Sequence, residues 1–402
     1  MNNIVIRDIR TTVTAPDGQN YVVVRVDTNE PDLYGIGCAS FAYRAEAVCA
    51  VVEHNLKPLL VGRSVSRIEE LWKLMMVNGY WRNGPVLNNA ISGIDMALWD
   101  IKGKMANMPV YDLLGGKCRE YVTPYRHANA KTKEEIFELV DQYTSEGFRY
   151  IRSNYTSFEG PSDSNDYLCL RNKVFTYDPR VYVNNVVDLM ESLRDKYGNS
   201  IELMTDIHER VDPADAAYVI KQLEAVNMFF VEDAVSPEQG EWLRNVRAQC
   251  VTPLALGELF VNSTEWLPLV KDRLLDFIRV HPSMIGGITG AKKCAAVCEA
   301  FGVRTAFHGP LDMSPIGHVA QIHIDMAIPN FGIQEFYGAV SEATTEMFPG
   351  SPVCKDGMLM LANEKPGLGI EFDEKIAAKY PPKTGATGWT EMRLPDGSLH
   401  TP

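Results

Sequence analysis

Three short apolar stretches, Ile201-Glu-Leu-Met-Thr-Asp206, Met228-Phe-Phe-Val-Glu232 and Pro253-Leu-Ala-Leu-Gly-Glu258, each end on an acidic residue. The intervals from 206 to 232 and from 232 to 258 are both 26 residues. One strand-plus-helix unit has about this length, so neighbouring parallel strands would bring the three carboxylates together. Converging carboxylates form an oxygen-ligand site for a hard cation such as Mg²⁺. The alternative is that each residue caps a helix or forms a strand-end ion pair.

The same pattern extends to eight β-rich runs, which alternate with amphipathic segments such as 213–225 and 291–301. Strands and helices in alternation predict a parallel sheet. Eight units in about 215 residues suit a TIM-like barrel, whose functional groups lie at the carboxyl ends of the strands. The runs cover residues 121–127, 148–153, 201–206, 228–232, 253–258, 277–281, 303–308 and 331–335.

The regions before and after the predicted barrel do not show its alternation of strand and helix patterns. Residues 1–116 are β-like up to residue 40 and mainly helical over 44–108, which predicts a small α+β domain. Gly35-Ile-Gly37 lacks the third glycine of a nucleotide-binding loop, so we expect a close-packed strand there. Residues 117–340 are predicted as the barrel domain, and 341–402 as a segment that packs back on the first domain.

One interval between the predicted strands is long. Residues 154–185 include the polar, turn-rich stretch Glu159-Gly-Pro-Ser-Asp-Ser-Asn-Asp166. Long loops in compact domains are usually functional or disordered. We therefore expect an extended loop over the barrel mouth.

Composition narrows the class of protein. The chain has 402 residues, of which 46% are hydrophobic and 23% charged, as in globular proteins. A net charge of −13 argues against nucleic acid or an anionic membrane as the main partner. The eight cysteines form no Cys-x-x-Cys pair, no signal-peptide core is visible, and no apolar run reaches the roughly 18 residues of a membrane helix. We expect a reduced, cytoplasmic protein.

Further polar residues fall at predicted strand ends. His208 lies two positions beyond Asp206, on the same side of an extended segment, where a histidine can exchange a proton with a substrate. Arg279 could hold a substrate carboxylate or form an internal ion pair. His308 could bind substrate or be a buried core histidine, and Asp312 could orient it. Two single strand-end residues with weaker support are His127 and Glu335.

Taken in order, these residues resemble the enolase superfamily and, within it, the D-mannonate dehydratase group. The resemblance covers nearly the whole chain and implies an N-terminal α+β capping domain joined to a modified (β/α)7β barrel. Longer stretches that support it are residues 80–85, 92–102, 286–290 and 365–375. The motifs are Asp206-x-His208, Val-Glu232-Asp, Gly-Glu258, Arg279, His308-Gly-Pro-x-Asp312 and Gln-Glu335.

The resemblance implies a Mg²⁺-dependent lyase acting on a sugar acid. Asp206, Glu232 and Glu258 would be the metal ligands, and the cation would stabilise the enediolate formed when the α-proton leaves. Loss of the β-hydroxyl then gives a 2-keto-3-deoxy sugar acid, with His208 as an acid/base residue. The resemblance also implies that the protein forms a homo-oligomer. The residues implied to line the sugar-acid pocket are His127, Glu258, Arg279, His308, Asp312 and Glu335.

The chain departs from the group in the part of the site that would bind the sugar. Related racemases carry Lys-x-Lys where this chain has Arg152-Ser-Asn154, so a lysine-based racemase is not expected. Arg152 is the catalytic arginine of the dehydratases, but the motif of its tyrosine partner is missing. Tyr155 and Tyr167 are the nearest candidates. Ala42 replaces a pocket asparagine, and no tryptophan ends the chain.

Two functions therefore remain open. One is dehydration of a D-mannonate or D-gluconate type of acid. The other is a divergent homologue with altered or no mannonate dehydratase activity, which binds another acid sugar or has a regulatory role.

Overall fold

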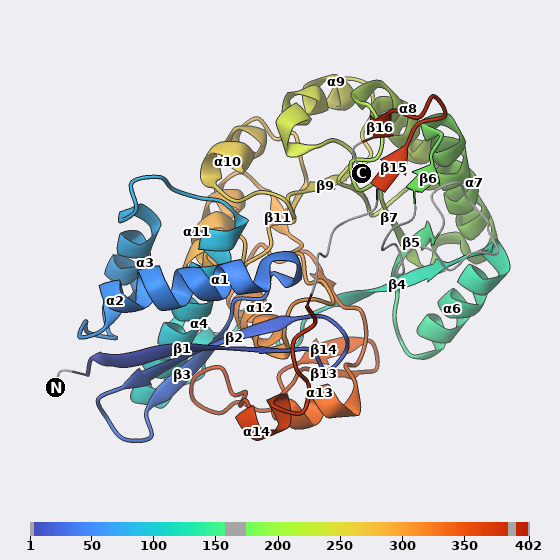
Figure 1. Ribbon diagram of the computed structural model, residues 1–402. Coiled ribbons are helices and arrows are strands. Elements are labelled where there is room, and N and C mark those ends of the chain that lie inside the picture. Colours follow the sequence, from blue (N-terminus) through green and yellow to red (C-terminus); the bar gives the residue numbers. More distant parts are fainter. Residues whose placement is uncertain (1–3, 157–173, 385–390, 401–402) are drawn as a thin grey trace.

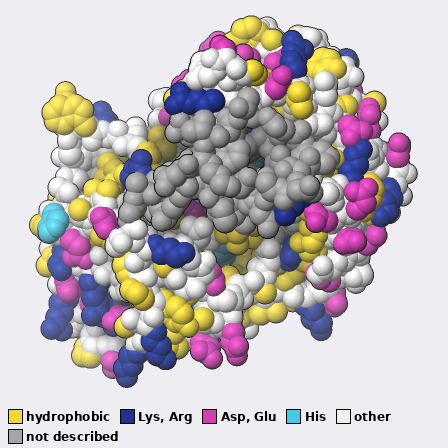
Figure 2. All heavy atoms as spheres, turned by 45° about the vertical axis from the view of Figure 1, so that its right-hand side comes forward, with side chains coloured by type: hydrophobic (Ala, Val, Ile, Leu, Met, Phe, Trp, Pro, Cys, Tyr) yellow, Lys and Arg dark blue, Asp and Glu magenta, His cyan; other side chains and the backbone are white. Residues whose placement is uncertain are grey.

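The computed structural model describes residues 4–156, 174–384 and 391–400. Its N-terminal part is a three-stranded antiparallel sheet covered by helices, and its central part is a parallel barrel (Figure 1). Within the described residues, no helix is long and apolar enough to cross a membrane. Acidic and basic side chains are interspersed on the described surface in Figure 2, so the negative net charge is not gathered into one patch of that face.

The capping sheet is a meander in the order β1-β2-β3. Turn residues 16–18 and 29–31 join its strands, as the sequence predicts. One face of the sheet carries buried valines and isoleucines that pack on the helices. The elements of this part are β1 Ile6–Thr14, β2 Tyr21–Thr28, β3 Tyr34–Cys38, α1 Ala45–Val51, the π-helical turn Val52–Leu56, α2 Lys57–Leu60, α3 Ile68–Val77, α4 Pro85–Ala106 and α5 Val110–Leu113.

Helix α4 is buried on nearly all sides because it lies between the capping sheet and helix α11 (Gly287–Ala300) of the barrel. Two glycines of β3 allow this close approach. A Cβ atom at Gly35 would lie 2.0 Å from the Ala97 carbonyl oxygen, and one at Gly37 would lie 1.9 Å from the Gly93 carbonyl oxygen. The expected close-packed strand is thus confirmed.

Eight parallel strands form the barrel, in the order β11-β10-β9-β8-β7-β5-β4-β12. A parallel bridge between Thr305 and Phe331 joins β11 to the segment before β12 and closes the sheet. Each strand lies within or overlaps one of the eight predicted runs. They are β4 Pro124–Ala130, β5 Tyr150–Tyr155, β7 Glu202–Asp206, β8 Phe230–Glu232, β9 Leu254–Leu256, β10 Phe277–Ile278, β11 Arg304–Thr305 and β12 Gln334–Glu335.

Seven α-helices connect these strands in the described part of the barrel, which confirms the (β/α)7β architecture. The long interval of residues 154–185 falls partly outside the described residues, and helix α7 already begins at Pro179. The predicted helices 213–225 and 291–301 correspond to α8 and α11, whose ends lie within four residues of the predicted ones. The connecting helices are α6 Lys133–Ser145, α7 Pro179–Tyr197, α8 Pro213–Leu223, α9 Leu243–Arg247, α10 Ser263–Lys271, α11 and α12 Pro315–Ala327.

The C-terminal segment contacts both parts of the molecule. Near the capping sheet, the Thr14 hydroxyl donates to the carbonyl of Tyr380, and the Asn20 amide donates to that of Lys383. Residues 391–400 instead pair with β6 (Val174–Thr176), on the barrel side (Figure 1). The elements are α13 Glu342–Met347, β13 Val353–Lys355, β14 Met358–Met360, α14 Glu374–Ala377, β15 Glu391–Arg393 and β16 Leu399–His400.

An apolar layer fills the barrel interior below the site. It consists of one residue from each of seven strands or their immediate ends: Tyr125, Met204, Phe230, Ala255, Phe277, Ala306 and Ile333. Side chains two positions apart on a strand point to the same face. The residue two positions after a member of this apolar layer therefore points into the barrel mouth, above the closely packed layer.

Candidate active site

The polar residues at the barrel mouth follow that two-residue rule. Six of them lie two positions beyond a member of the apolar layer: His127, Asp206, Glu232, Arg279, His308 and Glu335. Arg152 has the same relation to Tyr150, which packs against the layer. The structure thus brings together residues from seven different strands, as the strand-end positions in the sequence predicted.

Three buried carboxylates could hold a metal ion. Asp206, Glu232 and Asp233 each offer one oxygen atom, and these atoms lie within 4.8 Å of one another. Asp233 was not among the predicted ligands, because adjacent strand residues point to opposite faces. Its backbone has a φ of +39°, which lies outside the strand conformation and turns the side chain back to the mouth. Its Oδ1 accepts a hydrogen bond from the Gly257 amide at 3.1 Å.

Glu258 does not belong to that cluster among the described residues. It lies three positions beyond Ala255, and Gly257 before it has a φ of +138° that favours glycine. Its Oε2 lies 3.3 Å from His308 Nε2. Burial and the neighbouring charges of Asp206 and Glu232 raise the pKa of Glu258 well above its usual value, so it lies close enough to interact with both.

Two buried guanidinium groups link the carboxylates. Arg152 Nη1 lies 2.7 Å from Asp206 Oδ2 and 3.1 Å from Glu232 Oε2. Arg279 Nε lies 2.5 Å from Glu232 Oε1, and its Nη2 donates to Glu335 Oε2 at 2.9 Å. Burial alone would lower the pKa of each arginine, but these carboxylates hold it well above the ordinary value. Both groups therefore remain charged.

The arginines do not neutralise every carboxylate. Burial raises the pKa of Glu232 to about 7 despite Arg279 and Arg152, and burial with Glu258 raises the pKa of Asp233 well above its usual value. Oδ2 of Asp233 is buried without a hydrogen-bond partner in the described structure. A divalent cation would supply the missing positive charge, and oxygen donors are those that Mg²⁺ prefers. The residues present therefore fit this metal.

His208 is held close to Asp206. Its Nε2 lies 2.8 Å from Asp206 Oδ2, and its Nδ1 lies 3.1 Å from Arg210 Nη1. Because a guanidinium only donates, Nδ1 accepts and the proton is on Nε2. His208 and Glu209 both have positive φ values, 51° and 60°, and the Glu209 amide donates to the Asp233 carbonyl at 2.8 Å. Such backbone strain is typical of functional sites.

Two further predicted residues line the same mouth. His127 Nε2 lies 2.9 Å from Glu335 Oε1, and burial with the charge of Arg152 lowers the pKa of His127 to about 4. Opposing charges from Arg279 and His308 hold the pKa of Glu335 well below its usual value, although burial would raise it. The imidazole of His127 is therefore neutral beside an ionised carboxylate.

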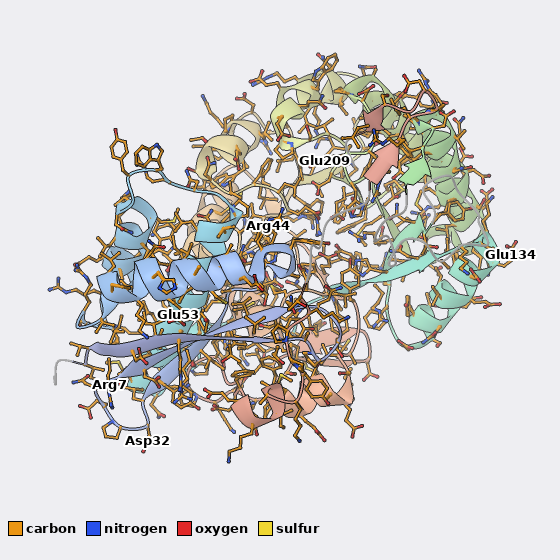
Figure 3. All side chains as sticks on the ribbon, in the orientation of Figure 1. Arg7, Asp32, Arg44, Glu53, Glu134 and Glu209 are labelled. Atoms are coloured by element: carbon orange, nitrogen blue, oxygen red, sulfur yellow. The ribbon has the colours of Figure 1, made fainter. Side chains whose placement is uncertain are left out.

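Asp312 connects the barrel mouth to the capping domain. Its carboxylate accepts a hydrogen bond from the backbone of Ala42, the position where the resemblance expects a pocket asparagine. Burial raises the pKa of Asp312 to about 6. Figure 3 shows Arg44 at the end of α1 that faces the barrel, and Glu209 in the loop after β7. The capping domain thus contributes its first helical segment to the edge of the site.

Among the described residues, the tyrosine next to Arg152 is one that the sequence did not indicate. Tyr167 lies outside the described residues, and Tyr155 lies three positions beyond Arg152, on the face that packs against the surrounding helices. Arg152 Nη2 instead donates to the hydroxyl of Tyr337 at 3.4 Å. Tyr337 lies two residues beyond Glu335, so the two-residue rule could have indicated it.

A barrel with carboxylates, guanidinium groups and imidazoles at its strand ends, closed by an α+β cap, defines a metal-assisted acid–base enzyme. Two family models match the chain: the mandelate racemase / muconate lactonizing enzyme N-terminal domain over residues 2–115, and the enolase C-terminal domain-like family over residues 135–376. Together they cover both parts of the fold.

Relatives narrow the assignment. The chain is 48% identical to a D-galactonate dehydratase family member of Enterocloster bolteae and 46% identical to family member RspA of Pantoea ananatis, over the full length of both partners. It also matches the crystal structure of an enolase from Pantoea ananatis with bound D-gluconate and Mg, with a TM-score of 0.94, 46% identity and full coverage of both chains. The chain therefore belongs to the D-galactonate dehydratase family of the enolase superfamily, a family of hydro-lyases.

Proposed function

We propose that the protein removes water from a six-carbon aldonic acid of the D-gluconate or D-mannonate type, in a Mg²⁺-dependent reaction that gives a 2-keto-3-deoxy acid. The observation that carries the proposal is the excess of buried carboxylates at the barrel mouth. These groups match what a divalent cation and a sugar acid need, and a relative of 46% identity has been crystallised with D-gluconate and Mg. The substrate of that relative is transferred here as part of the proposal.

The metal ligands in this proposal are Asp206, Glu232 and Glu258. Bound Mg²⁺ would supply positive charge beside the substrate carboxylate, which favours loss of the neighbouring proton. Asp233 has a supporting role in this proposal, in which its Oδ1 accepts a hydrogen bond from the amide of Gly257 and its Oδ2 faces the metal site. It would fix the backbone turn that directs Glu258 into the mouth.

The remaining residues bind and orient the sugar acid. Arg279 holds Glu232 and Glu335, so it would fix these two carboxylates at the pocket. His127, Glu335, His308 and Asp312 present polar atoms that can hydrogen-bond sugar hydroxyls. His208 would protonate the hydroxyl that leaves from C3. Only His308 and Asp312 of the four hydroxyl-binding residues are more than slightly exposed, which makes them the first groups that a substrate meets.

The direct test is incubation of the protein with Mg²⁺ and a panel of aldonates, followed by detection of 2-keto acids with semicarbazide. Product from D-gluconate or D-mannonate, abolished by chelator and restored by Mg²⁺, is the expected result. If no acid in the panel gives product but one of them raises the melting temperature, the divergent-homologue hypothesis replaces dehydration. That outcome would point to binding of an acid sugar in a regulatory role.

Metal binding is tested separately by calorimetric titration with Mg²⁺. Glu232→Gln and Glu258→Gln should each abolish measurable binding, because each removes a proposed ligand charge. Asp233→Asn keeps an oxygen that can accept from Gly257, so it should weaken binding by about 10- to 100-fold at most, as is typical of groups that support metal ligands. If Asp233→Asn abolishes binding and Glu258→Gln does not, the cluster of Asp206, Glu232 and Asp233 is the metal site.

We also propose that the protein self-associates through the connection between α3 and α4. Tyr80 and Trp81 in this connection are 77% and 84% exposed, and they border a groove of about 870 Å³ that also contains Trp72 and Trp266. Exposed aromatic side chains of this kind are typical of interfaces. Trp81→Ala should lower the mass measured by light scattering after gel filtration. Trp242→Ala, which removes a half-exposed tryptophan on another surface, should not.

A further inference from the structure

Tyr337 lies at the centre of the polar network at the barrel mouth. Its ring stacks on the imidazole of His127, with centroids 3.7 Å apart and planes 15° from parallel. Its hydroxyl accepts a hydrogen bond from Arg152 Nη2 at 3.4 Å. Because Tyr337 lies two residues beyond Glu335, its side chain points to the same side as that carboxylate. The phenol is thus part of the site.

The arrangement leaves one chemical role unassigned. Dehydration needs a base that takes the proton from C2. Nδ1 of His127 and Nδ1 of His308 are buried without a hydrogen-bond partner among the described residues, so these histidines are the alternative to a tyrosine. Nδ1 of His208 faces Arg210, and Nε2 of His127 faces Glu335. Tyr155 points toward the helices around the barrel, where Asp188 and Glu134 are its nearest charges. Among the described residues, Tyr337 is the tyrosine that contacts Arg152.

We propose that the phenolate oxygen of Tyr337, paired with Arg152, is the base that removes the C2 proton of the sugar acid. This inference rests on the dehydration proposed above and names a residue for its first step. Resemblance to the dehydratases places a tyrosine in the loop after the second strand. Among the described residues, the tyrosine at Arg152 follows the eighth strand, so the proposed pair is built from a different part of the barrel.

The proton and electron movements balance without a further reactant. The Tyr337 oxygen forms a bond to the C2 hydrogen, and the electron pair of the C2–H bond moves into a C1–C2 double bond. That pair then forms the C2–C3 double bond as the C3–O bond breaks, and the leaving hydroxyl takes a proton from the imidazolium form of His208, which is left as the neutral imidazole. The enol product tautomerises to the 2-keto acid, and the net change is loss of one water molecule.

Arg152 explains why a tyrosine at this position can act as a base. Its Nη1 contacts Asp206 and Glu232, while its Nη2 contacts Tyr337. One rigid, planar cation therefore fixes the phenol relative to the proposed metal ligands. A nearby positive charge also favours the phenolate over the phenol. Stacking on His127, which Glu335 holds in place, sets the orientation of the ring.

A purely structural role is the alternative. Tyr337 also lines a cavity of about 50 Å³ between the capping domain and the barrel, with Tyr21 and Met313 among its other walls. If the ring only fills this space, removal of the hydroxyl oxygen should leave catalysis unchanged. Removal of the hydroxyl oxygen alone therefore distinguishes the two roles: it slows catalysis if Tyr337 is the base and leaves the rate unchanged if the ring only fills the cavity.

The test compares Tyr337→Phe with the matched variant Tyr155→Phe, each with Mg²⁺ and the aldonate that the wild-type protein turns over. Loss of the C2 proton signal in D₂O, followed by NMR, reports proton removal, and 2-keto acid formation reports the complete reaction. Tyr337→Phe should slow both by about 100-fold or more, the usual contribution of a general base. Its calorimetric affinity for D-gluconate and its melting temperature should stay near wild type. Tyr155→Phe should keep both rates.

Three results would overturn the assignment. If Tyr337→Phe exchanges the C2 proton at a rate within about threefold of the wild-type rate, the hydroxyl is not the base. Loss of affinity with an unchanged rate of exchange makes Tyr337 a substrate-binding group only. If wild-type protein neither exchanges the proton nor forms product from any aldonate, the proposed dehydration itself fails. That last outcome is recognised before any variant is made.

Discussion

Arg279→Met is the most informative change for the electrostatics of the site. Methionine has nearly the shape of the arginine side chain but no charge, and Arg279 is completely buried. The change removes the contacts to Glu232 at 2.5 Å, to Glu335 at 2.9 Å and to the Ala306 carbonyl at 3.0 Å. Loss of one partner from a buried ion pair costs about 3–5 kcal/mol, because the other charge stays buried. For a barrel domain of this size, that corresponds to a decrease in melting temperature of roughly 6–20 °C.

The chain offers a closely matched control. Arg149 Nη2 lies 2.9 Å from Glu202 Oε1, the same distance as between Arg279 Nη2 and Glu335 Oε2. The side chains of Arg149 and Glu202 are 59% and 27% exposed, whereas those of the other pair are both fully buried. Exposed pairs contribute about 0–1 kcal/mol. Arg149→Met should therefore shift the melting temperature by only a few degrees at most.

Scanning calorimetry of the metal-free proteins at several pH values provides the measurement. Without Arg279, the folded-state pKa values of Glu232 and Glu335 rise, so the folded protein binds more protons than the unfolded chain near neutral pH. Stability of Arg279→Met should then decrease as the pH rises from about 5 to 8. Mg²⁺ should stabilise this variant more than wild type, because it replaces the lost charge at Glu232. Equal shifts for Arg279→Met and Arg149→Met would refute the argument that burial makes the pair essential.

Two more predictions concern helix α4, which packs against the barrel on one side and the capping sheet on the other. Burial raises the pKa of Asp95 to about 7, although Thr289 donates two hydrogen bonds to its carboxylate. The free energy of unfolding is therefore highest while Asp95 is protonated, and it decreases as the pH rises from about 4 to 7. Asp95→Asn should reduce this pH dependence by a few kcal/mol, measured by urea unfolding from pH 4 to 8; an unchanged dependence would contradict the assignment. Gly37→Ala should destabilise the protein by about 3 kcal/mol in the same assay, because its Cβ atom would meet the Gly93 carbonyl oxygen. Gly79→Ala, with 3.7 Å of clearance, should be nearly neutral, and similar effects of both glycine changes would contradict the packing argument.

The sequence predicts the barrel well because its signals are local and periodic. Each strand is a short apolar run that ends in a polar residue, and each helix has an amphipathic pattern between two such runs. Asp206 and Glu232 illustrate the result: both lie two positions beyond an interior apolar residue, Met204 and Phe230. Strand geometry alone then places them on the interior face, so their convergence follows once the strands are known to be parallel neighbours.

The same reasoning fails where the backbone leaves the strand conformation. Asp233 follows Glu232 directly and would point away from the mouth, but its positive φ brings it into the cluster. Glu258 lies three positions beyond Ala255, and only the glycine conformation at position 257 directs it toward the site. Such turns depend on hydrogen bonds between different strands, as between Asp233 and Gly257. A pattern read along one chain segment does not contain this information.

The tyrosine beside Arg152 escaped prediction for a related reason. A motif search looks for it near Arg152 in the sequence, whereas barrel closure brings the eighth strand next to the first, and β4 in turn pairs with β5. Tyr337 is 185 positions from Arg152 along the chain, yet their side chains meet across the barrel mouth. Closure of the barrel thus brings into contact two side chains that no local sequence motif connects.

The balance of charge explains why these features belong together. Five carboxylates meet at the barrel mouth, those of Asp206, Glu232, Asp233, Glu258 and Glu335, and two guanidinium groups, from Arg152 and Arg279, lie among them. Burial, together with the charges of neighbouring carboxylates that two guanidinium groups do not offset, raises the pKa values of Glu232, Asp233 and Glu258. A divalent cation would lower all three, and the arginines would then be free to act on other partners. For Arg152 the nearest such partner is Tyr337, so metal binding and the basicity of the phenol would be linked through one guanidinium group.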